Sequence, residues 1–242
     1  MGIGDDVITL ARARQLYLKT GRSYCPRDRQ GRARADRPIY QNSPYISPDG
    51  DTISEYPDNK RPYEGEILYQ APRAEFHLRP ELDAWAQQQA ERPYIILNPD
   101  AKPNAHYSNN KHWYRPHWHR LIELLKKQYP KYRLVRAGYD KMQYEYDLET
   151  VTTTTVHDLI ALIKYASWLI TTEGAPHHIA AGTGTRTTVI YGHCTSPNTT
   201  GYQGQQALYD PQGPCNSRHP CSQCEISMRR ITPEQVVDTV RL

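Results

Sequence analysis

The spacing of apolar residues separates a strongly patterned second part of the chain from a weakly patterned first part. In the second part, short apolar runs typical of buried strands occur at 94–97, 133–138, 168–171 and 188–191. Apolar residues at helical spacing predict helices at 116–129, 156–166, 178–181 and 233–241. Helix starts are marked by Pro116, by Thr155 and by a capping box from Thr232 to Gln235. Strands that alternate with helices form parallel sheets, so we predict a Rossmann-like α/β domain at residues 91–242.

Residues 1–90 show little periodicity and are predicted to form a smaller, separate lobe. A Gly-rich turn at 2–5 leads into a helix that reaches about residue 20. The following stretch, 21–92, is rich in Pro, Tyr, Arg and Asp, and its prolines interrupt any long element. Within it we predict short strands at 38–40 and 66–69, a helix at 81–90 and a linker at 87–93.

Composition narrows the class of protein. The 242 residues, 38% of them hydrophobic, suffice for one large or two small domains. No apolar run approaches the roughly 20 residues that cross a bilayer, and residues 1–6 lack the pattern of a secretory signal. The five cysteines are an odd number, which argues against a disulfide framework. We therefore expect a cytoplasmic protein.

The positive charge is concentrated near the N-terminus. Between residues 12 and 37 the acidic residues are only Asp28 and Asp36. The basic residues in the same stretch are Arg12, Arg14, Lys19, Arg22, Arg27, Arg29, Arg32, Arg34 and Arg37. Such a region is typical of a surface that binds an anionic partner, such as a nucleotide, an acidic glycan or a nucleic acid. An ordinary solvated surface is the alternative, and the sequence leaves both open.

The turn between the predicted strand at 168–171 and the helix after it is the best candidate for a binding site. It contains Glu173, Gly174, Pro176, His177 and His178. A turn at the carboxyl end of a parallel strand is where α/β sheets bind ligands, and free N–H groups at a helix start suit a phosphate. Glu173 is suited to the hydroxyls of a ribose. The alternative is a plain strand-to-helix turn.

The stretch from Glu173 to Gly192 resembles the nucleotide-sugar signature of the heptosyltransferase-like family 9 glycosyltransferases, the superfamily of ADP-heptose:lipopolysaccharide heptosyltransferases. The matching positions, without a gap, are Glu173, Pro176, His178, Ala180, Ala181, Gly184 and Thr185. Ala175 stands where Gly is usual and Arg186 where Pro is usual. The chain would be a short, divergent member. The resemblance implies a GT-B-like α/β fold of two Rossmann-like lobes, with a reduced acceptor-side lobe at 1–90 and a donor lobe at 91–242.

Two further positions match the family. Lys111 and Trp113 resemble its Lys-x-Trp motif, in which the lysine is suited to the donor diphosphate and the tryptophan supports it by packing. Gly4 and Asp5 resemble its Gly-Asp turn, in which the aspartate is the expected general base. Asp5 as a plain helix cap is the alternative, and Asp6 could cap instead. The family places a strand before this turn, for which only residues 1–3 are available here.

The resemblance implies inverting transfer of a sugar from a nucleotide-sugar donor to an acceptor hydroxyl. Glu173 would bind the ribose, Lys111 and the helix start the diphosphate, and His178, or instead His177, the phosphate or sugar. No metal or other cofactor would be required. The expected acceptor is a glycan. Two alternatives remain: a phage-type enzyme that glycosylates hydroxymethylated bases in DNA, and a non-catalytic protein that binds a sugar nucleotide or another partner.

Three cysteines near the C-terminus form a weak candidate metal site. Cys215, Cys221 and Cys224 could bind zinc together with His219 or Cys194. Convincing zinc sites usually carry two Cys-x2-Cys pairs, whereas only one is present here. Free thiols or an opportunistic disulfide are the favoured interpretation. The donor sugar, its base, the acceptor and the oligomeric state are left open.

Overall fold

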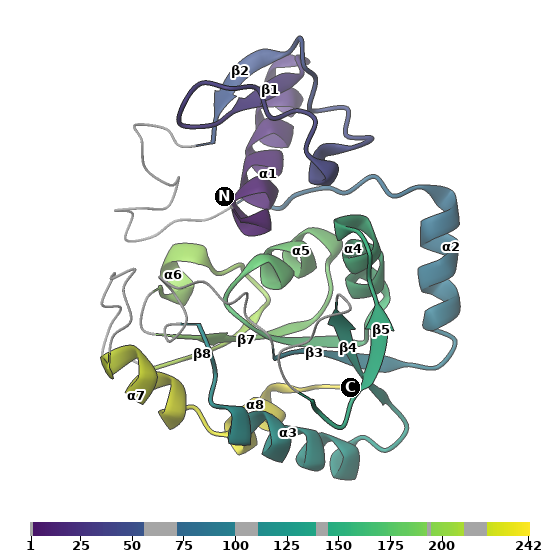
Figure 1. Ribbon diagram of the computed structural model, residues 1–242, viewed down its shortest axis with the longest axis vertical. Coiled ribbons are helices and arrows are strands. Elements are labelled where there is room, and N and C mark those ends of the chain that lie inside the picture. Colours follow the sequence, from purple (N-terminus) through teal and green to yellow (C-terminus); the bar gives the residue numbers. More distant parts are fainter. Residues whose placement is uncertain (1, 56–71, 100–110, 139–144, 193–194, 211–221) are drawn as a thin grey trace.

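The computed structural model describes residues 2–55, 72–99, 111–138, 145–192, 195–210 and 222–242 (Figure 1). A six-stranded parallel sheet lies at its centre. The strands are β3 (Tyr94–Asn98), β4 (Arg133–Gly138), β5 (Glu149–Thr152), β6 (Trp168–Thr172), β7 (Thr187–Tyr191) and β8 (Gln206–Tyr209). Their order across the sheet is β5-β4-β3-β6-β7-β8. From the centre of the sheet, β3, β4 and β5 follow one another toward one edge, and β6, β7 and β8 follow one another toward the other edge. This is the Rossmann order.

Helices cover both faces of this sheet, because alternate strand residues point to opposite sides. On one face Ile96 and Leu169 pack with α4 (Val156–Tyr165) and α5 (Ala175–Thr183). On the other face Ile95 and Ile170 pack with α3 (Arg115–Gln128) and α8 (Pro233–Thr239). The remaining helices of this part are α2 (Pro80–Gln89), α6 (Pro197–Thr200) and α7 (Ser222–Arg230). The predicted Rossmann-like domain is thus present.

The N-terminal part is much smaller. It consists of α1 (Ile3–Thr20), a 3-10 turn, η1 (Pro38–Tyr40), and a two-stranded parallel sheet of β1 (Tyr24–Arg27) and β2 (Asp51–Ser54). Leu10 and Ala11 of α1 join the same apolar core as Ile179 of α5, and α1 stands directly above α5 in Figure 1. The fold is GT-B-like with a reduced first lobe, as predicted. The boundary at residue 90 stays a prediction, because α2 packs on α4.

Several local predictions need correction. Residues 38–40 form a 3-10 turn and not a strand, since Pro38 begins it and has no N–H for a sheet. Residues 87–89 complete α2 and so are not linker. The Gly-rich turn at 2–5 is mainly the first turn of α1. The strand predicted at 66–69 lies outside the described residues.

The helix predicted at 178–181 is longer than expected, because Gly182 lies within α5 and does not end it. The helix ends at Gly184, whose φ of 77° is left-handed. A Cβ on Gly182 would lie 2.8 Å from the carbonyl oxygen of Ala74 and 2.6 Å from Cε2 of Phe76. The glycine therefore permits the 74–76 segment to approach α5 closely. Elsewhere the caps are as predicted: the hydroxyl of Thr155 accepts from the Asp158 N–H at 3.1 Å.

None of the described helices is both long and apolar enough to cross a membrane.

Candidate donor site

The site lies where the chain order of the sheet reverses, between β3 and β6. Ligands of open α/β sheets bind at this switch point, outside the carboxyl ends of the strands. The side-chain amide of Asn98, at the end of β3, donates to the Thr171 hydroxyl of β6 at 3.2 Å. The segment after β3 brings in Lys111, and the turn after β6 brings in Glu173. The topology therefore brings together Glu173, which was predicted to bind the ribose, and Lys111, which was predicted to bind the diphosphate.

Lys111 and Glu173 form an ion pair through Nζ and Oε2. The glutamate side chain is buried, at 5% exposure, whereas the lysine is 26% exposed. A buried carboxylate needs a partner, and the ammonium supplies one. About a quarter of the lysine side chain therefore stays exposed beside the buried carboxylate.

The turn after β6 is fixed by His177. The Gly174 N–H donates to Nδ1 of His177 at 2.9 Å, so this nitrogen carries no hydrogen. Nε2 must then carry it and donates to the Thr200 carbonyl at 3.0 Å. Burial lowers the pKa of His177, which favours this neutral form. Both ring nitrogens of His177 are thus hydrogen-bonded within the protein.

His178 lies beside it on the first turn of α5, with ring centroids 3.9 Å apart. Its Nδ1 is 2.8 Å from the Tyr202 hydroxyl. The side chain is buried, and burial lowers its pKa well below the usual range, with neighbouring His177 and Lys111 acting in the same direction. His178 is therefore a neutral imidazole at physiological pH. Pro176, also in this first turn, lacks an N–H that the helix could not use there.

The tip of α1 contacts this same turn. A Cβ placed on Gly4 would lie 3.2 Å from Cδ2 of His178 and 3.6 Å from the Ala175 nitrogen. Gly4 thus lies against the start of α5, although it is far from it in sequence. Asp5 is half-buried, and its Oδ2 accepts weakly from the Gly2 N–H at 3.4 Å. This is a capping contact of the kind the alternative interpretation requires.

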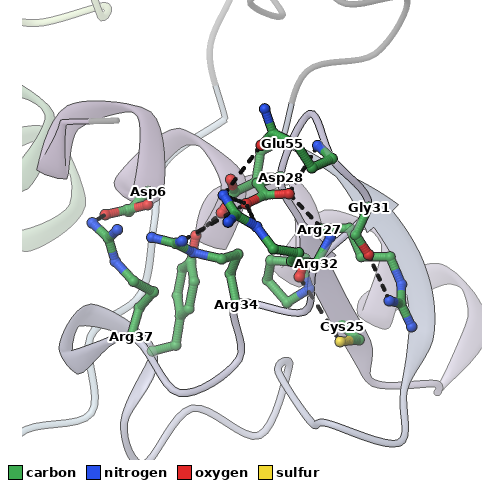
Figure 2. A network of polar contacts seen from close by, with 12 residues as sticks. Asp6, Cys25, Arg27, Asp28, Gly31, Arg32, Arg34, Arg37 and Glu55 are labelled. Carbon is green, nitrogen blue, oxygen red and sulfur yellow. Dashed lines mark hydrogen bonds and ion pairs between the residues drawn. The ribbon is translucent and has the colours of Figure 1, made fainter.

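The neighbouring Asp6 is placed differently. It is buried, at 1% exposure, and forms an ion pair with Arg37 (Figure 2). Burial raises the pKa of Asp6 to about 6 although Arg37 opposes the shift. Of the two adjacent acids, Asp5 keeps access to solvent and Asp6 belongs to the interior of the N-terminal part.

The basic N-terminal stretch is largely paired within the molecule. Figure 2 shows Arg32 and Arg34 around Asp28, and Arg37 beside Asp6. Other arginines have partners that are distant in sequence, which the distribution of charge along the chain could not predict. These partners are Ser54 for Arg12, Glu75 for Arg14, and Asp51 for Arg22. The arginines therefore stabilise a small lobe, and the stretch is not a uniformly basic face of the kind that favours a nucleic acid.

Three side chains at the donor site are of the types that bind metal ions. One ligand atom from each of Glu173, His177 and His178 lies within 4.8 Å of the others. However, His177 uses both nitrogens and Glu173 is paired with Lys111. Of the cysteine cluster, Cys224 is buried in α7, while Cys215, Cys221, Cys194 and His219 lie outside the described residues.

The sequence did not predict that the segment at 200–205 forms hydrogen bonds with both histidines. Thr200 and Tyr202 bond to the two rings, and Gln205 Nε2 donates to the His177 carbonyl at 2.8 Å. No pattern in this stretch reveals these contacts. Trp113 is buried, and its Nε1 donates to the Ile231 carbonyl at 2.9 Å. Its support of Lys111 by packing stays a prediction.

Comparison with solved structures supports the fold. The glycosyltransferase family 9 protein from Veillonella parvula superposes with a TM-score of 0.63 at 13% identity, over 99% of this chain and 93% of that one. The iron-containing dodecameric glycosyltransferase TibC from enterotoxigenic E. coli H10407 gives 0.63 at 16% identity, over 99% and 72%. E. coli ADP-heptose lipopolysaccharide heptosyltransferase II gives 0.50 at 20% identity, over 68% of this chain and 51% of its own length.

This chain thus spans about half of heptosyltransferase II. No curated protein sequence matches it significantly. The profile of glycosyltransferase family 9 (heptosyltransferase) matches residues 65–227, which is more than half of the chain and includes Lys111 and the turn after β6. With the Rossmann strand order and the site at its switch point, this match shows that the chain belongs to glycosyltransferase family 9.

Proposed function

We propose that the protein transfers a sugar from a nucleoside-diphosphate sugar to an acceptor hydroxyl. One observation carries the proposal: Gly4 of α1 lies against the first turn of α5, the helix that follows the turn containing Glu173, the partner of Lys111. Asp5, the candidate base, is the next residue along α1, which supports a role for it near the candidate donor ligands. Heptosyltransferase structures with ADP-heptose are known for relatives such as TibC, which supports a nucleotide-sugar donor.

The donor diphosphate would bind at the start of α5, where the helix dipole favours an anion. Lys111 would turn from Glu173 toward the phosphates, and Glu173 would then accept hydrogen bonds from the ribose hydroxyls. The exchange keeps both charged groups partnered throughout, so that neither is left bare in a buried site. His178 would donate to a phosphate or sugar oxygen.

In the reaction, the acceptor oxygen would attack the anomeric carbon as its proton passes to the Asp5 carboxylate. The bond between that carbon and the diphosphate oxygen breaks, and the nucleoside diphosphate leaves with the electron pair. Attack from the face opposite the leaving group inverts the configuration. Lys111 and the start of α5 would stabilise the charge that develops on the diphosphate, without a metal ion.

A glycan is the favoured acceptor. The DNA alternative depended on a free basic N-terminal region, and the pairing of Arg12, Arg14, Arg34 and Arg37 within the molecule weakens that argument. A non-catalytic protein that only binds the donor would show the same geometry. A measurement of transfer activity must therefore decide between a transferase and such a binding protein.

The first experiment is a thermal-shift screen of nucleoside diphosphates and their sugars, because a ligand of the folded state raises the melting temperature. With the donor identified, Asp5→Asn is expected to reduce transfer by about 10²–10⁴-fold, the usual contribution of a general base. Affinity for the nucleoside diphosphate should stay within about twofold, since Asp5 is not a donor ligand. Asp49→Asn, in an exposed loop, is the matched control.

Full turnover in the Asp5→Asn variant would remove this residue from the mechanism. Loss of both transfer and nucleotide affinity would instead assign it to binding. Exhaustive treatment with a chelator should leave the transfer rate unchanged; a rate that falls and returns with an added divalent cation would contradict a metal-free mechanism.

A further inference from the structure

The 200–205 segment fixes the orientation of the two histidines on α5. Its three bonds to that helix come from the Thr200 carbonyl, the Tyr202 hydroxyl and the Gln205 amide. The Tyr202 ring also packs edge-on against His178, with centroids 5.6 Å apart at 82°. Tyr202 therefore touches His178 both through its hydroxyl and through its ring.

A neutral histidine has one N–H, and its partners decide which nitrogen carries it. For His177 the answer is forced, because the Gly174 N–H can only donate. For His178 the partner is a hydroxyl, which can donate or accept. The choice matters because Nδ1 faces Tyr202, while Cδ2, bonded to Nε2, faces Gly4 and the contact between α1 and α5.

We propose that Tyr202 is a positioning residue: its hydroxyl donates to Nδ1 of His178 and thereby keeps the ring hydrogen on Nε2, where it can donate to the donor diphosphate. This inference rests on the proposed function for the identity of the ligand, but the placement of the hydrogen does not depend on it. The arrangement gives the site a second neutral donor beside the helix start. A neutral donor suits a site where Lys111 already supplies the positive charge.

Among the described contacts of His178, the bond to Tyr202 is the one made by a ring nitrogen, and it uses Nδ1. Nε2 can therefore serve a ligand without any protein bond being broken. The 200–205 segment follows β7 and is not part of the matching signature at 173–192. The contact of Tyr202 with His178 therefore comes from the tertiary fold and not from the motif.

Nuclear magnetic resonance of the full chain, labelled with nitrogen-15 at histidine, tests the proton placement without any ligand. Two-bond correlations distinguish protonated from bare ring nitrogens, and the His178→Gln variant identifies the signals among the ten histidines. We expect bare Nδ1 and protonated Nε2 at His178. Tyr202→Phe should produce a mixture of tautomers at His178, while His177 keeps its own. A wild-type His178 protonated at Nδ1 would overturn the proposal.

Titration calorimetry with ADP, or with the nucleoside diphosphate that the thermal screen selects, tests the consequence for binding. Tyr202→Phe should weaken affinity by about threefold to tenfold, as expected for one neutral hydrogen bond. His178→Gln should weaken it similarly, and the double variant should lose no more than His178→Gln alone, because Tyr202 acts through His178.

Tyr129→Phe is the matched control, because it removes a tyrosine hydrogen bond, to the Val240 carbonyl at 2.9 Å, away from the site. Melting temperatures of all variants show whether they remain folded. Additive losses in the double variant would overturn the positioning role. If no nucleotide binds the wild-type protein, the proposed function fails, whereas the tautomer experiment still decides the role of Tyr202.

Discussion

The two parts of this molecule are stabilised in different ways. The Rossmann part has a six-stranded sheet with an apolar core on each face. The N-terminal part has two strands and one long helix, and that helix shares its core with α5. Arginine–carboxylate pairs add to its contacts. The core against α3 and α8 is formed by residues of the large part, whereas the core of the small part is shared with the large part, so we expect the small part to depend more on the large one than the reverse.

The largest effect is expected from removing core side chains. Leu10→Ala in α1 and Leu125→Ala in α3 should each lower the free energy of unfolding by about 2–5 kcal/mol, because both leucines are buried. Their consequences should differ. Leu10→Ala should remove amide-exchange protection from α1, β1 and β2 while α3 and β4 stay protected, whereas Leu125→Ala should weaken both parts.

Urea denaturation with hydrogen-exchange mass spectrometry measures this difference. Equal loss of protection across α3 and β4 in the Leu10→Ala variant would show that the two parts unfold as one unit.

A smaller effect concerns the pH dependence of stability and comes from Glu55. Burial raises its pKa from 4.5 to about 7; the nearby Asp6 also raises it, and Arg34 and Arg37 oppose the shift. The folded state thus holds this proton more tightly than the unfolded chain. The contribution of Glu55 to the free energy of unfolding is therefore full below about pH 4.5, and it declines as the pH rises toward and beyond 7. Glu55→Gln should reduce this decline by about 1–3 kcal/mol.

Glu75 is the matched comparison, since hydrogen bonds from Arg14 and Tyr45 lower its pKa. Its contribution is present above pH 4.5 and is lost as the pH falls, so Glu75→Gln should cost stability at neutral pH, by less than about 1 kcal/mol for so exposed a pair. Thermal melts from pH 4 to pH 8 check both. Parallel melting curves for the Glu55→Gln variant and the wild type would contradict the assignment for Glu55.

The smallest effect is expected from a surface pair in the N-terminal part. Arg22 and Asp51 lie 3.5 Å apart with side chains 73% and 53% exposed. Arg22→Ala should change the free energy of unfolding by less than about 0.5 kcal/mol, and added salt should reduce that difference further. Denaturation at low and high salt measures it. A larger loss would mean that exposed pairs also hold the small part together.

How much the sequence predicted depended on how deeply each element is buried. The central strands β3, β6 and β7 were predicted, because their residues are apolar on both faces. The edge strands β5 and β8 were missed, because Glu149–Thr152 and Gln206–Tyr209 are only partly buried and carry polar residues. In the N-terminal part β1 and β2 were missed because each has only four residues, which are too few to give a periodic signal.

The candidate site shows the same limit. Glu173, His178, Lys111 and Asp5 could be selected from short motifs whose spacing is local. Tyr202 and the pairing of Asp6 with Arg37 could not, because each contact joins segments that only the tertiary fold brings together. The sequence favoured His178 over His177 as a ligand through the gapless match to the family signature, and that choice stays a prediction; the bonds of the two rings to Thr200 and Tyr202 could not be predicted.

The contact of Gly4 with α5 lies at one end of a helix of 18 residues, about 27 Å long. If α1 tilts about this contact by ~10°, its far end at Thr20, 16 residues away, travels about 4 Å, while Asp5, one residue from the pivot, moves by less than about 1 Å. A tilt of this size would shift the outer surface of the small part and leave the contact between Gly4 and His178 nearly unchanged.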